Sequence, residues 1–217
     1  MGWLRCLVTG LLAVAVMSAG ASAENPQKPV KIVALGDSLT AGFRLRPSEA
    51  FPVQLAAALR KKGIEVEIVN AGVSGDTSRA GLERLDWAVP EGTEAVIIEL
   101  GANDALRGVD PAETRRSLDA IMRRLKSRGI EMLLAGMEAP RNLGPEYGRA
   151  FNAIYPELAQ AHGSLLYPFF LKGVALDPKL NLPDGLHPTA EGVARIVERI
   201  MPDVIELVAR ARRRRHS

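Results

Sequence analysis

Cysteine and aromatic residues are scarce in this sequence of 217 residues. Its one cysteine is Cys6, and Phe, Tyr and Trp together make up 5% of the chain. Residues 24–217 therefore hold no thiol for a disulfide bond or a thiolate metal site. The few aromatic residues are not interleaved with basic ones, which argues against a surface that stacks nucleic-acid bases. We expect a domain stabilised by its hydrophobic core, with no nucleic-acid partner.

Residues 1–23 have the pattern of a secretory signal peptide. Arg5 gives a positive start, Leu7 to Met17 is an apolar run, and Ala21-Ser22-Ala23 is a small-x-small cleavage site. An uncleaved membrane anchor is the alternative, but an anchor needs about 20 strongly apolar residues and this run is shorter. No later stretch is apolar for long enough to span a bilayer. We expect residues 24–217 to be exported as a soluble protein.

Basic residues outnumber acidic ones by 28 to 25, and the sequence pI is near 9.2. Five arginines lie in the last eight positions: Arg210, Arg212, Arg213, Arg214 and Arg215. Without them and Arg5, 22 basic side chains face 25 acidic ones, a net charge of −3. We interpret residues 210–217 as a solvated, frayed tail of a domain formed by residues 24–209. Contact of this tail with an anionic membrane surface is the alternative.

Short β-branched runs alternate with longer helical patterns along the chain. The runs typical of strands are Val30–Leu35, Val66–Asn70, Ala95–Leu100, Glu131–Ala135 and Leu165–Tyr167. The helical patterns cover residues 50–62, 78–88, 111–128, 146–161 and 189–210. Several of the strands are almost wholly apolar, as expected when both faces of a parallel sheet are covered. The alternation predicts one α/β domain, a three-layer αβα sandwich around a five-stranded parallel sheet.

Ligands of open parallel sheets bind at the carboxyl ends of the strands, so the loops that follow strands are candidate sites. In the first loop, Ser38 begins a helical turn, where its backbone N–H could bind an oxyanion. In the second and third loops, the Gly75 N–H and the Asn103 side chain could donate to the same anion. The alternatives are an N-cap for Ser38, a glycine-rich turn at Gly75 and a helix cap for Asn103.

The last of these loops contains Asp184-Gly185-Leu186-His187. Of the three histidines, His162 lies at a helix–strand junction and His216 lies in the tail, so His187 alone has a suitable place. Asp184 can accept a hydrogen bond from Nδ1 of His187, which leaves Nε2 free to act as a base. A metal pair is the alternative, but with no cysteine and no second loop histidine we expect no metal.

In this order, a loop serine, a loop glycine, a loop asparagine and a final Asp-x-x-His resemble the SGNH (GDSL) hydrolase family. The resemblance extends from Lys31 to about Val204. The segments AGVSGDTSRAGLERL and ELGANDALRG look like the bacterial thioesterase I, lysophospholipase L1 and arylesterase subgroup. The resemblance implies a flavodoxin-like fold, a periplasmic location and hydrolysis without a cofactor.

The resemblance also implies a role for each residue. Ser38 would be the nucleophile and His187 the general base, oriented by Asp184. The backbone N–H groups of Ser38 and Gly75 and the side chain of Asn103 would form an oxyanion hole, supported by Asp37 and Asp104. The sequence departs from the family pattern at Ala102, where glycine is frequent. It also departs in the stretch Met137–Tyr147, which is shorter than in the best-known relatives, so acyl-length preference is not carried over.

The expected activity is hydrolysis of short-to-medium acyl esters or thioesters by a monomer, through an acyl-enzyme. Apolar residues in the strand-end loops are candidates for an acyl groove, or else pack the loops: Leu106, Val109, Met137 and Leu143. A carbohydrate O-deacetylase on the same fold is an alternative, although a sugar site would need more aromatic residues. A non-catalytic envelope protein that binds an anion is a second alternative, and it leaves the Asp184–His187 pair without a role.

Overall fold

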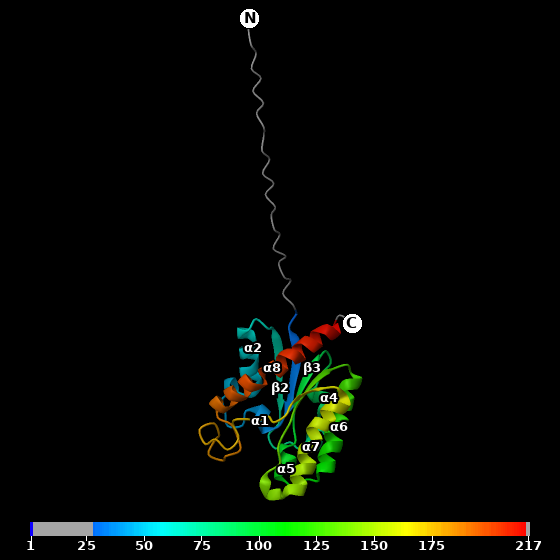
Figure 1. Ribbon diagram of the computed structural model, residues 1–217, viewed down its shortest axis with the longest axis vertical. Coiled ribbons are helices and arrows are strands. Elements are labelled where there is room, and N and C mark those ends of the chain that lie inside the picture. The colour runs from blue at the N-terminus through cyan, green and yellow to red at the C-terminus, as the bar shows by residue number, and fades with distance from the viewer. Residues whose placement is uncertain (2–27, 216–217) are drawn as a thin grey trace.

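The computed structural model describes Met1 and residues 28–215, and its centre is a five-stranded parallel sheet (Figure 1). The strands are β1 (Val30–Gly36), β2 (Val66–Gly72), β3 (Ala95–Glu99), β4 (Glu131–Ala135) and β5 (Leu165–Tyr167), in the order β2-β1-β3-β4-β5. The predicted fold class and all five strands are confirmed. Apart from Met1, the expected leader lies outside the described residues. In the part of the chain that is described, no helix has the length and apolar character needed to cross a membrane.

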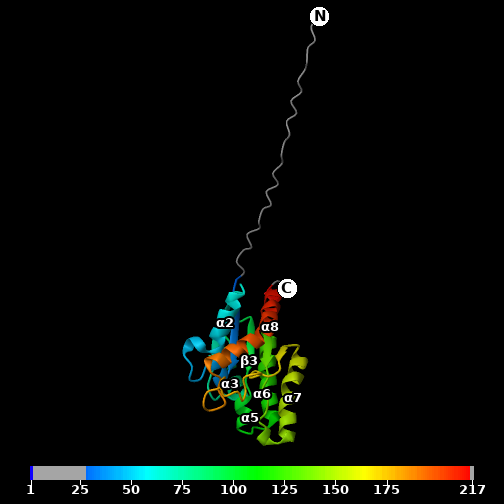
Figure 2. The ribbon, with the colours of Figure 1, turned by 60° about the vertical axis from the view of Figure 1, so that its left-hand side comes forward.

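Helices cover both faces of the sheet (Figures 1 and 2). On one face lie α2 (Phe51–Lys61) and α8 (Ala190–Arg215). On the other face lie α3 (Ser78–Glu83), α4 (Leu85–Ala88), α6 (Pro111–Ser127) and α7 (Pro145–His162). Two short helices, α1 (Ser38–Ala41) and α5 (Ala102–Leu106), begin directly after β1 and β3, and two 3₁₀ turns cover Pro47–Glu49 and Arg141–Leu143.

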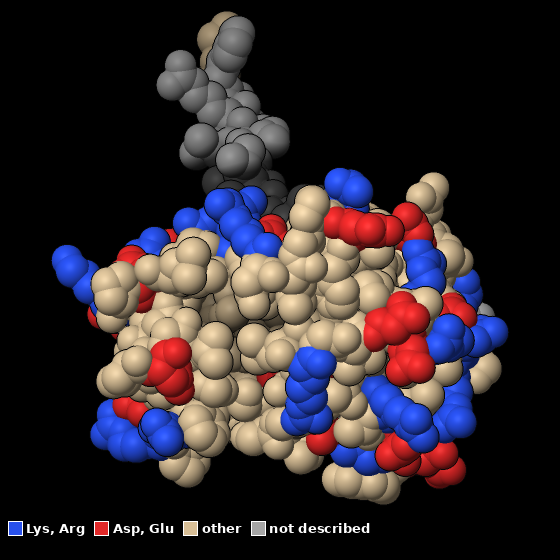
Figure 3. Space-filling view, turned by 90° about the horizontal axis from the view of Figure 1, so that it is seen from below, with Lys and Arg blue, Asp and Glu red and all other residues tan. Residues whose placement is uncertain are grey.

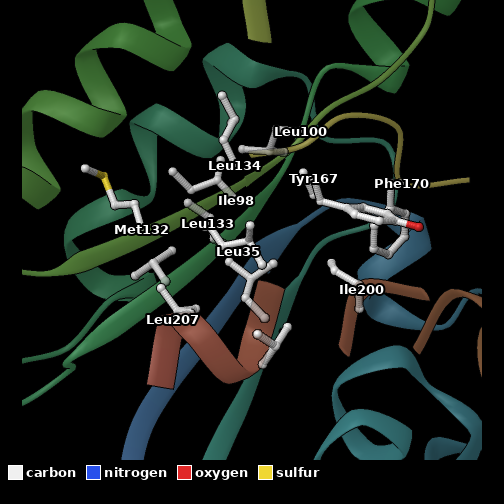
Figure 4. Packing of buried hydrophobic residues seen from close by; sticks show 14 of the residues in the cluster. Leu35, Ile98, Leu100, Met132, Leu133, Leu134, Tyr167, Phe170, Ile200 and Leu207 are labelled. Atoms are coloured by element: carbon white, nitrogen blue, oxygen red, sulfur yellow. The ribbon is translucent and has the colours of Figure 1, made fainter. Parts of the chain in front are cut away.

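The core forms where apolar strand residues meet the apolar sides of the helices. Every residue of β3 is buried, as are all but one residue each of β1 and β4. In the packing shown by Figure 4, Ile200 and Leu207 of α8 lie beside strand residues such as Leu35 and Leu133. Complete burial of one such side chain is worth about 1.5–3 kcal/mol. The sheet is therefore a rigid support for the loops that leave its carboxyl edge.

The single helix expected over residues 78–88 is divided into α3 and α4 at Arg84. The backbone at Arg84 leaves the helical region, with φ −100° and ψ 5°. Its side chain is buried, donates to the carbonyl of Gly36 over 2.9 Å and pairs with Asp76. The helix therefore breaks where the cationic side chain of Arg84 turns into the interior. Its partners, Gly36 and Asp76, lie 48 and 8 residues away in the sequence.

The C-terminal arginines differ from the expected frayed tail, because α8 continues to Arg215 and includes all five of them. Arg215 donates to the carbonyls of Lys28 and Pro29, each over 2.8 Å, and pairs with Glu94. Arg210 donates to the carbonyl of Gly163 over 3.0 Å. Helix α8 therefore continues past the boundary placed at residue 209, as far as Arg215. Arg215 therefore holds the end of α8 against the start of β1, and Arg210 holds it against the turn after α7.

We predict that Arg215→Ala lowers the free energy of unfolding by about 1 kcal/mol, because it removes two hydrogen bonds and an ion pair at the start of β1. The measurement is the urea midpoint at unchanged slope. Arg213→Ala is the control, since Arg213 is mostly exposed and pairs with Glu206 of the same helix. We expect its effect to stay within about 0.5 kcal/mol. Equal effects of the two substitutions would contradict the role given to Arg215.

Candidate active site

The turn that carries Ser38 packs directly on the ends of β1 and β2. A Cβ atom on Gly36 would lie 2.1 Å from Oγ1 of Thr40, and one on Gly72 would lie 2.3 Å from the backbone N of Ala41. Both contacts are too close for any side chain, so glycine is required at these two strand ends. Because the two glycines are paired in register, they form one flat surface beneath α1.

Asp37, and not Ser38, is the N-cap of α1. The Asp37 carboxylate accepts a hydrogen bond from the backbone N–H of Leu39 over 2.9 Å. Ser38 is the first residue of the helix and is 9% exposed. The alternative that Ser38 serves only as a helix cap is thus wrong, and its side chain is available for another partner.

That partner is His187, from the loop before α8. Oγ of Ser38 and Nε2 of His187 are 2.9 Å apart, and Nδ1 of His187 is 2.9 Å from Oδ2 of Asp184. The ring of Phe43 packs against the imidazole, with centroids 4.5 Å apart. The structure therefore joins the three residues that the sequence singled out, although Ser38 and His187 are 149 positions apart. Phe43 was not predicted, since nothing in the local sequence indicates its contact with His187.

Three predicted hydrogen-bond donors lie in the loops that follow β1, β2 and β3. The backbone N–H groups of Ser38 and Gly75 have no acceptor among the described residues. The Asn103 amide donates to Oδ2 of Asp37 and to the carbonyl of Asp76, each over 3.0 Å. Asn103 therefore does not cap a helix. Its amide ties the first, second and third loops together.

Gly75 adopts a left-handed conformation, with φ +88°. Its carbonyl accepts a hydrogen bond from Nη2 of Arg107 over 2.8 Å. Asp104, the other predicted support, is buried and accepts hydrogen bonds from the backbone and hydroxyl of Ser78 and from the hydroxyl of Thr114. Asp104 thus fixes the start of α3 to α5, just beyond the loop that contains Gly75.

The carboxyl groups of Asp37 and Asp184 are shifted in opposite directions. Burial raises the pKa of Asp37 to about 6, against the hydrogen bonds from Leu39 and Asn103. The backbone N–H groups of Leu186 and His187 donate to Asp184 and lower its pKa to about 2. Asp184 is therefore ionised throughout the neutral range, as a carboxylate that orients a histidine should be.

Exposed apolar side chains lie in the loops that carry the candidate site residues. Figure 3 views the molecule from the side where the strands end, and charged side chains are more frequent towards the edges of this face than at its middle. Val73, Leu106 and Leu186 are exposed, and each lies within three residues of Gly75, Asn103 or His187. Apolar groups therefore flank the site from three loops.

The residues proposed from sequence for an acyl groove differ in their exposure to solvent. Leu106 is 52% exposed, whereas Met137 is 3% exposed and belongs to the hydrophobic core. Met137 is therefore a packing residue, because it directly follows the buried strand β4 and Gly136. Val109 and Leu143 are partly buried, and the carbonyl of Val109 accepts a hydrogen bond from Tyr147.

A Ser–His–Asp chain of hydrogen bonds at the carboxyl edge of a parallel sheet is the arrangement of a serine hydrolase. The comparison with known families agrees with this class. The protein belongs to the GDSL-like Lipase/Acylhydrolase family, whose model matches residues 34–195. The resemblance to SGNH (GDSL) hydrolases found in the sequence is thereby confirmed.

Characterised relatives are similar over most of the chain. The protein is 34% identical over 203 residues to a protein named esterase TesA from Pseudomonas aeruginosa, covering 93% of this chain and 98% of that one. It is 40% identical over 161 residues to thioesterase 1/protease 1/lysophospholipase L1 from Escherichia coli, covering 74% and 76%. The solved structure of AlinE4, described as an SGNH-hydrolase family esterase, is 47% identical with a TM-score of 0.70, covering 82% of this chain and 96% of that chain.

We predict that Asp184→Asn flattens the acid limb of the stability curve. A carboxyl whose pKa is lower in the folded state stabilises the fold above its unfolded pKa, and this contribution is lost as the pH falls towards the folded value. The difference in unfolding free energy between the wild type and Asp184→Asn should therefore be constant above about pH 5 and shrink towards pH 2. Urea unfolding at a series of pH values measures it. An unchanged acid limb in Asp184→Asn would contradict the assignment.

Proposed function

We propose that this protein is a serine hydrolase that cleaves acyl esters or thioesters through an acyl-enzyme. The observation that carries the proposal is the pair of 2.9 Å contacts that link Ser38, His187 and Asp184. A serine hydroxyl is a weak nucleophile unless a base removes its proton, and a histidine held by a carboxylate supplies that base. The names of the relatives, which include esterase and thioesterase, support the same chemistry.

In the first step, Oγ of Ser38 attacks the carbonyl carbon while Nε2 of His187 takes its proton. The carbonyl oxygen becomes an anion. The backbone N–H groups of Ser38 and Gly75, in the loops after β1 and β2, can donate hydrogen bonds to it. Asn103 reaches the same place from the third loop if its N–H turns from the Asp76 carbonyl to the oxyanion while the bond to Asp37 is kept. Each donor of this kind is worth about 10²–10³ in turnover.

Collapse of the tetrahedral intermediate expels the alcohol or thiol, which receives the proton from His187. Water then enters, loses a proton to His187 and attacks the acyl group on Ser38. Collapse of this second intermediate breaks the bond to Oγ of Ser38, which regains the proton from His187 as the carboxylic acid leaves. Asp184 stays ionised in both steps and stabilises the imidazolium that forms twice. No step needs a metal ion or an organic cofactor.

For the substrate, we propose acyl groups of short to medium length. The exposed side chains of Val73, Leu106 and Leu186 offer apolar surface beside the site. The whole chain contains ten aromatic residues, and among the described ones Phe43 is the ring that packs on His187, which is little for a carbohydrate platform. We also propose that the enzyme is monomeric and exported to the periplasm. Membrane contact through the arginines is not favoured, because Arg210, Arg213 and Arg215 have partners within the protein.

A fluorophosphonate probe should label the wild type at Ser38. Ser38→Ala should abolish labelling and lower the hydrolysis of a p-nitrophenyl ester by at least about 10⁴-fold, since the nucleophile is lost. The measurement combines peptide mapping of the labelled protein with initial rates. Ser48→Ala, at an exposed serine outside the site, is the matched control and should behave as the wild type. Full activity in Ser38→Ala, or labelling at another residue, would refute the proposed mechanism.

Rates over a series of esters from acetyl to palmitoyl should peak at short or medium acyl length. Longer chains extend beyond the apolar surface beside Ser38 and add little binding, whereas each buried CH₂ within it adds about 0.8 kcal/mol. The measurement is kcat/KM for each ester, with acyl-CoA and lysophospholipid in parallel. A maximum at palmitoyl would contradict the proposed preference. Activity confined to acetylated sugars would favour the O-deacetylase instead.

A further inference from the structure

Glu99 is a fully buried carboxyl group beneath the loop that carries Ser38. It is the last residue of β3, where the four residues before it are apolar. Its Oε2 accepts hydrogen bonds from the hydroxyl of Thr40 over 2.7 Å and from the backbone N–H of Asp37 over 3.3 Å. Its Oε1 is buried and receives no hydrogen bond from a donor in the described part of the chain. The mechanism described above gives Glu99 no task.

A hydrogen bond from the Glu99 side chain is also among the influences that lower the pKa of Asp37. Two ionised carboxylates cannot make such a bond, so one proton lies between them. Burial, reinforced by the charge of Asp37, raises the pKa of Glu99 well above its usual range. Asp37 is the less shifted partner, with a pKa of about 6. The proton therefore belongs to Glu99 when Asp37 is ionised.

The charged and titratable groups around Glu99 and Asp37 are consistent with a proton on Glu99. Tyr155 faces the pair from α7, and Asp104 of α5 faces Tyr155; neither brings a positive charge. His187 faces Asp37 from the last loop. Among the described residues Arg84 is a buried cation, but it donates to the Gly36 carbonyl and pairs with Asp76. In the described residues, Glu99 thus has neutral donors and one carboxylate as its partners.

Asp37 links this buried acid to the predicted oxyanion hole. Its Oδ1 accepts from the N–H of Leu39, and its Oδ2 accepts from Nδ2 of Asn103 over 3.0 Å. The orientation of the Asn103 amide therefore depends on where the Asp37 carboxylate is held. Glu99 holds Asp37 from below. It accepts a hydrogen bond from the backbone N–H of Asp37 and interacts with the Asp37 side chain.

We propose that Glu99, as a neutral carboxylic acid, is a positioning residue that fixes Asp37 and thereby orients the Asn103 amide towards the oxyanion. This inference rests on the proposed function of the same site. It assigns Glu99 no contact with the substrate. Its proton, and not its negative charge, is the feature that the site uses.

Glu99→Gln keeps a neutral side chain that forms hydrogen bonds, whereas Glu99→Leu removes the hydrogen bonds. The amide of Gln accepts from Thr40 and Asp37 through its oxygen and donates to the Asp37 carboxylate through its NH₂, so kcat should stay within about 3-fold of the wild type. Leu removes all three interactions, so kcat should fall by about 10–100-fold with little change in KM, because only an interaction of the transition state is weakened. A loss in Glu99→Gln as large as that in Glu99→Leu would overturn the proposal.

A double-mutant cycle with Asn103→Ala tests the path from Glu99. If Glu99 acts through Asn103, Glu99→Leu should lower kcat by less than about 3-fold in the Asn103→Ala background. An undiminished effect would overturn the proposal. Asn142→Ala, at an exposed asparagine, is the control background and should leave the effect of Glu99→Leu at full size.

The pH profile and the infrared spectrum need only Glu99→Gln and so do not depend on the folding of the Leu variant. As the pH rises, ionisation of Glu99 places a second charge beside Asp37, so wild-type kcat should fall on an alkaline limb that Glu99→Gln lacks. The wild-type spectrum at neutral pH should contain a carboxylic-acid band that the variant lacks. The same limb in both proteins, or no such band, would overturn the proposal. Failure of the wild type to react with a fluorophosphonate would instead refute the proposed function, since the infrared result does not depend on activity.

Discussion

The close contact of the α1 turn with the ends of β1 and β2 is the constraint on which the site depends. Gly36 and Gly72 provide it, since a Cβ atom on either would lie within 2.3 Å of α1. Because β1 lies between β2 and β3, the loops of Ser38, Gly75 and Asn103 leave the sheet side by side. Three hydrogen-bond donors from distant parts of the sequence are thereby brought together. Only His187 has to arrive from elsewhere, on the loop before α8.

Most of this arrangement could be predicted from the sequence. Continuous apolar runs such as AVIIEL indicate buried parallel strands, and parallel strands put their following loops at one edge. Ser38, Asn103 and His187 could therefore be selected by their place after a strand. The spacing of Asp184 and His187 is local, so their hydrogen bond could also be anticipated.

What the sequence did not indicate depends on partners far away along the chain. The break at Arg84 follows from contacts with Gly36 and Asp76, and the order of the last turn of α8 follows from Arg215 reaching Lys28 and Glu94. A run of arginines looks the same whether solvent or carbonyl groups surround it. Met137 was misjudged because a residue just past a strand end can continue the core instead of entering the loop surface. Glu99 did leave a signal, as the single charge in an apolar strand.

The carboxyl groups of the site are divided by their surroundings into two functions. Asp184 is held by backbone N–H groups and stays ionised, so it can stabilise a positive imidazolium. Asp37 and Glu99 lie where water does not reach, and an unpaired buried charge there would cost several kcal/mol. Sharing a proton avoids a second buried charge and leaves a directional hydrogen bond in its place. A donor group that must be rigid at the moment when an oxyanion forms is better held by such a bond than by a mobile, solvated one. Rigidity beneath the nucleophile and fixed charge beside the histidine are therefore separate requirements, and the fold meets them with different acids.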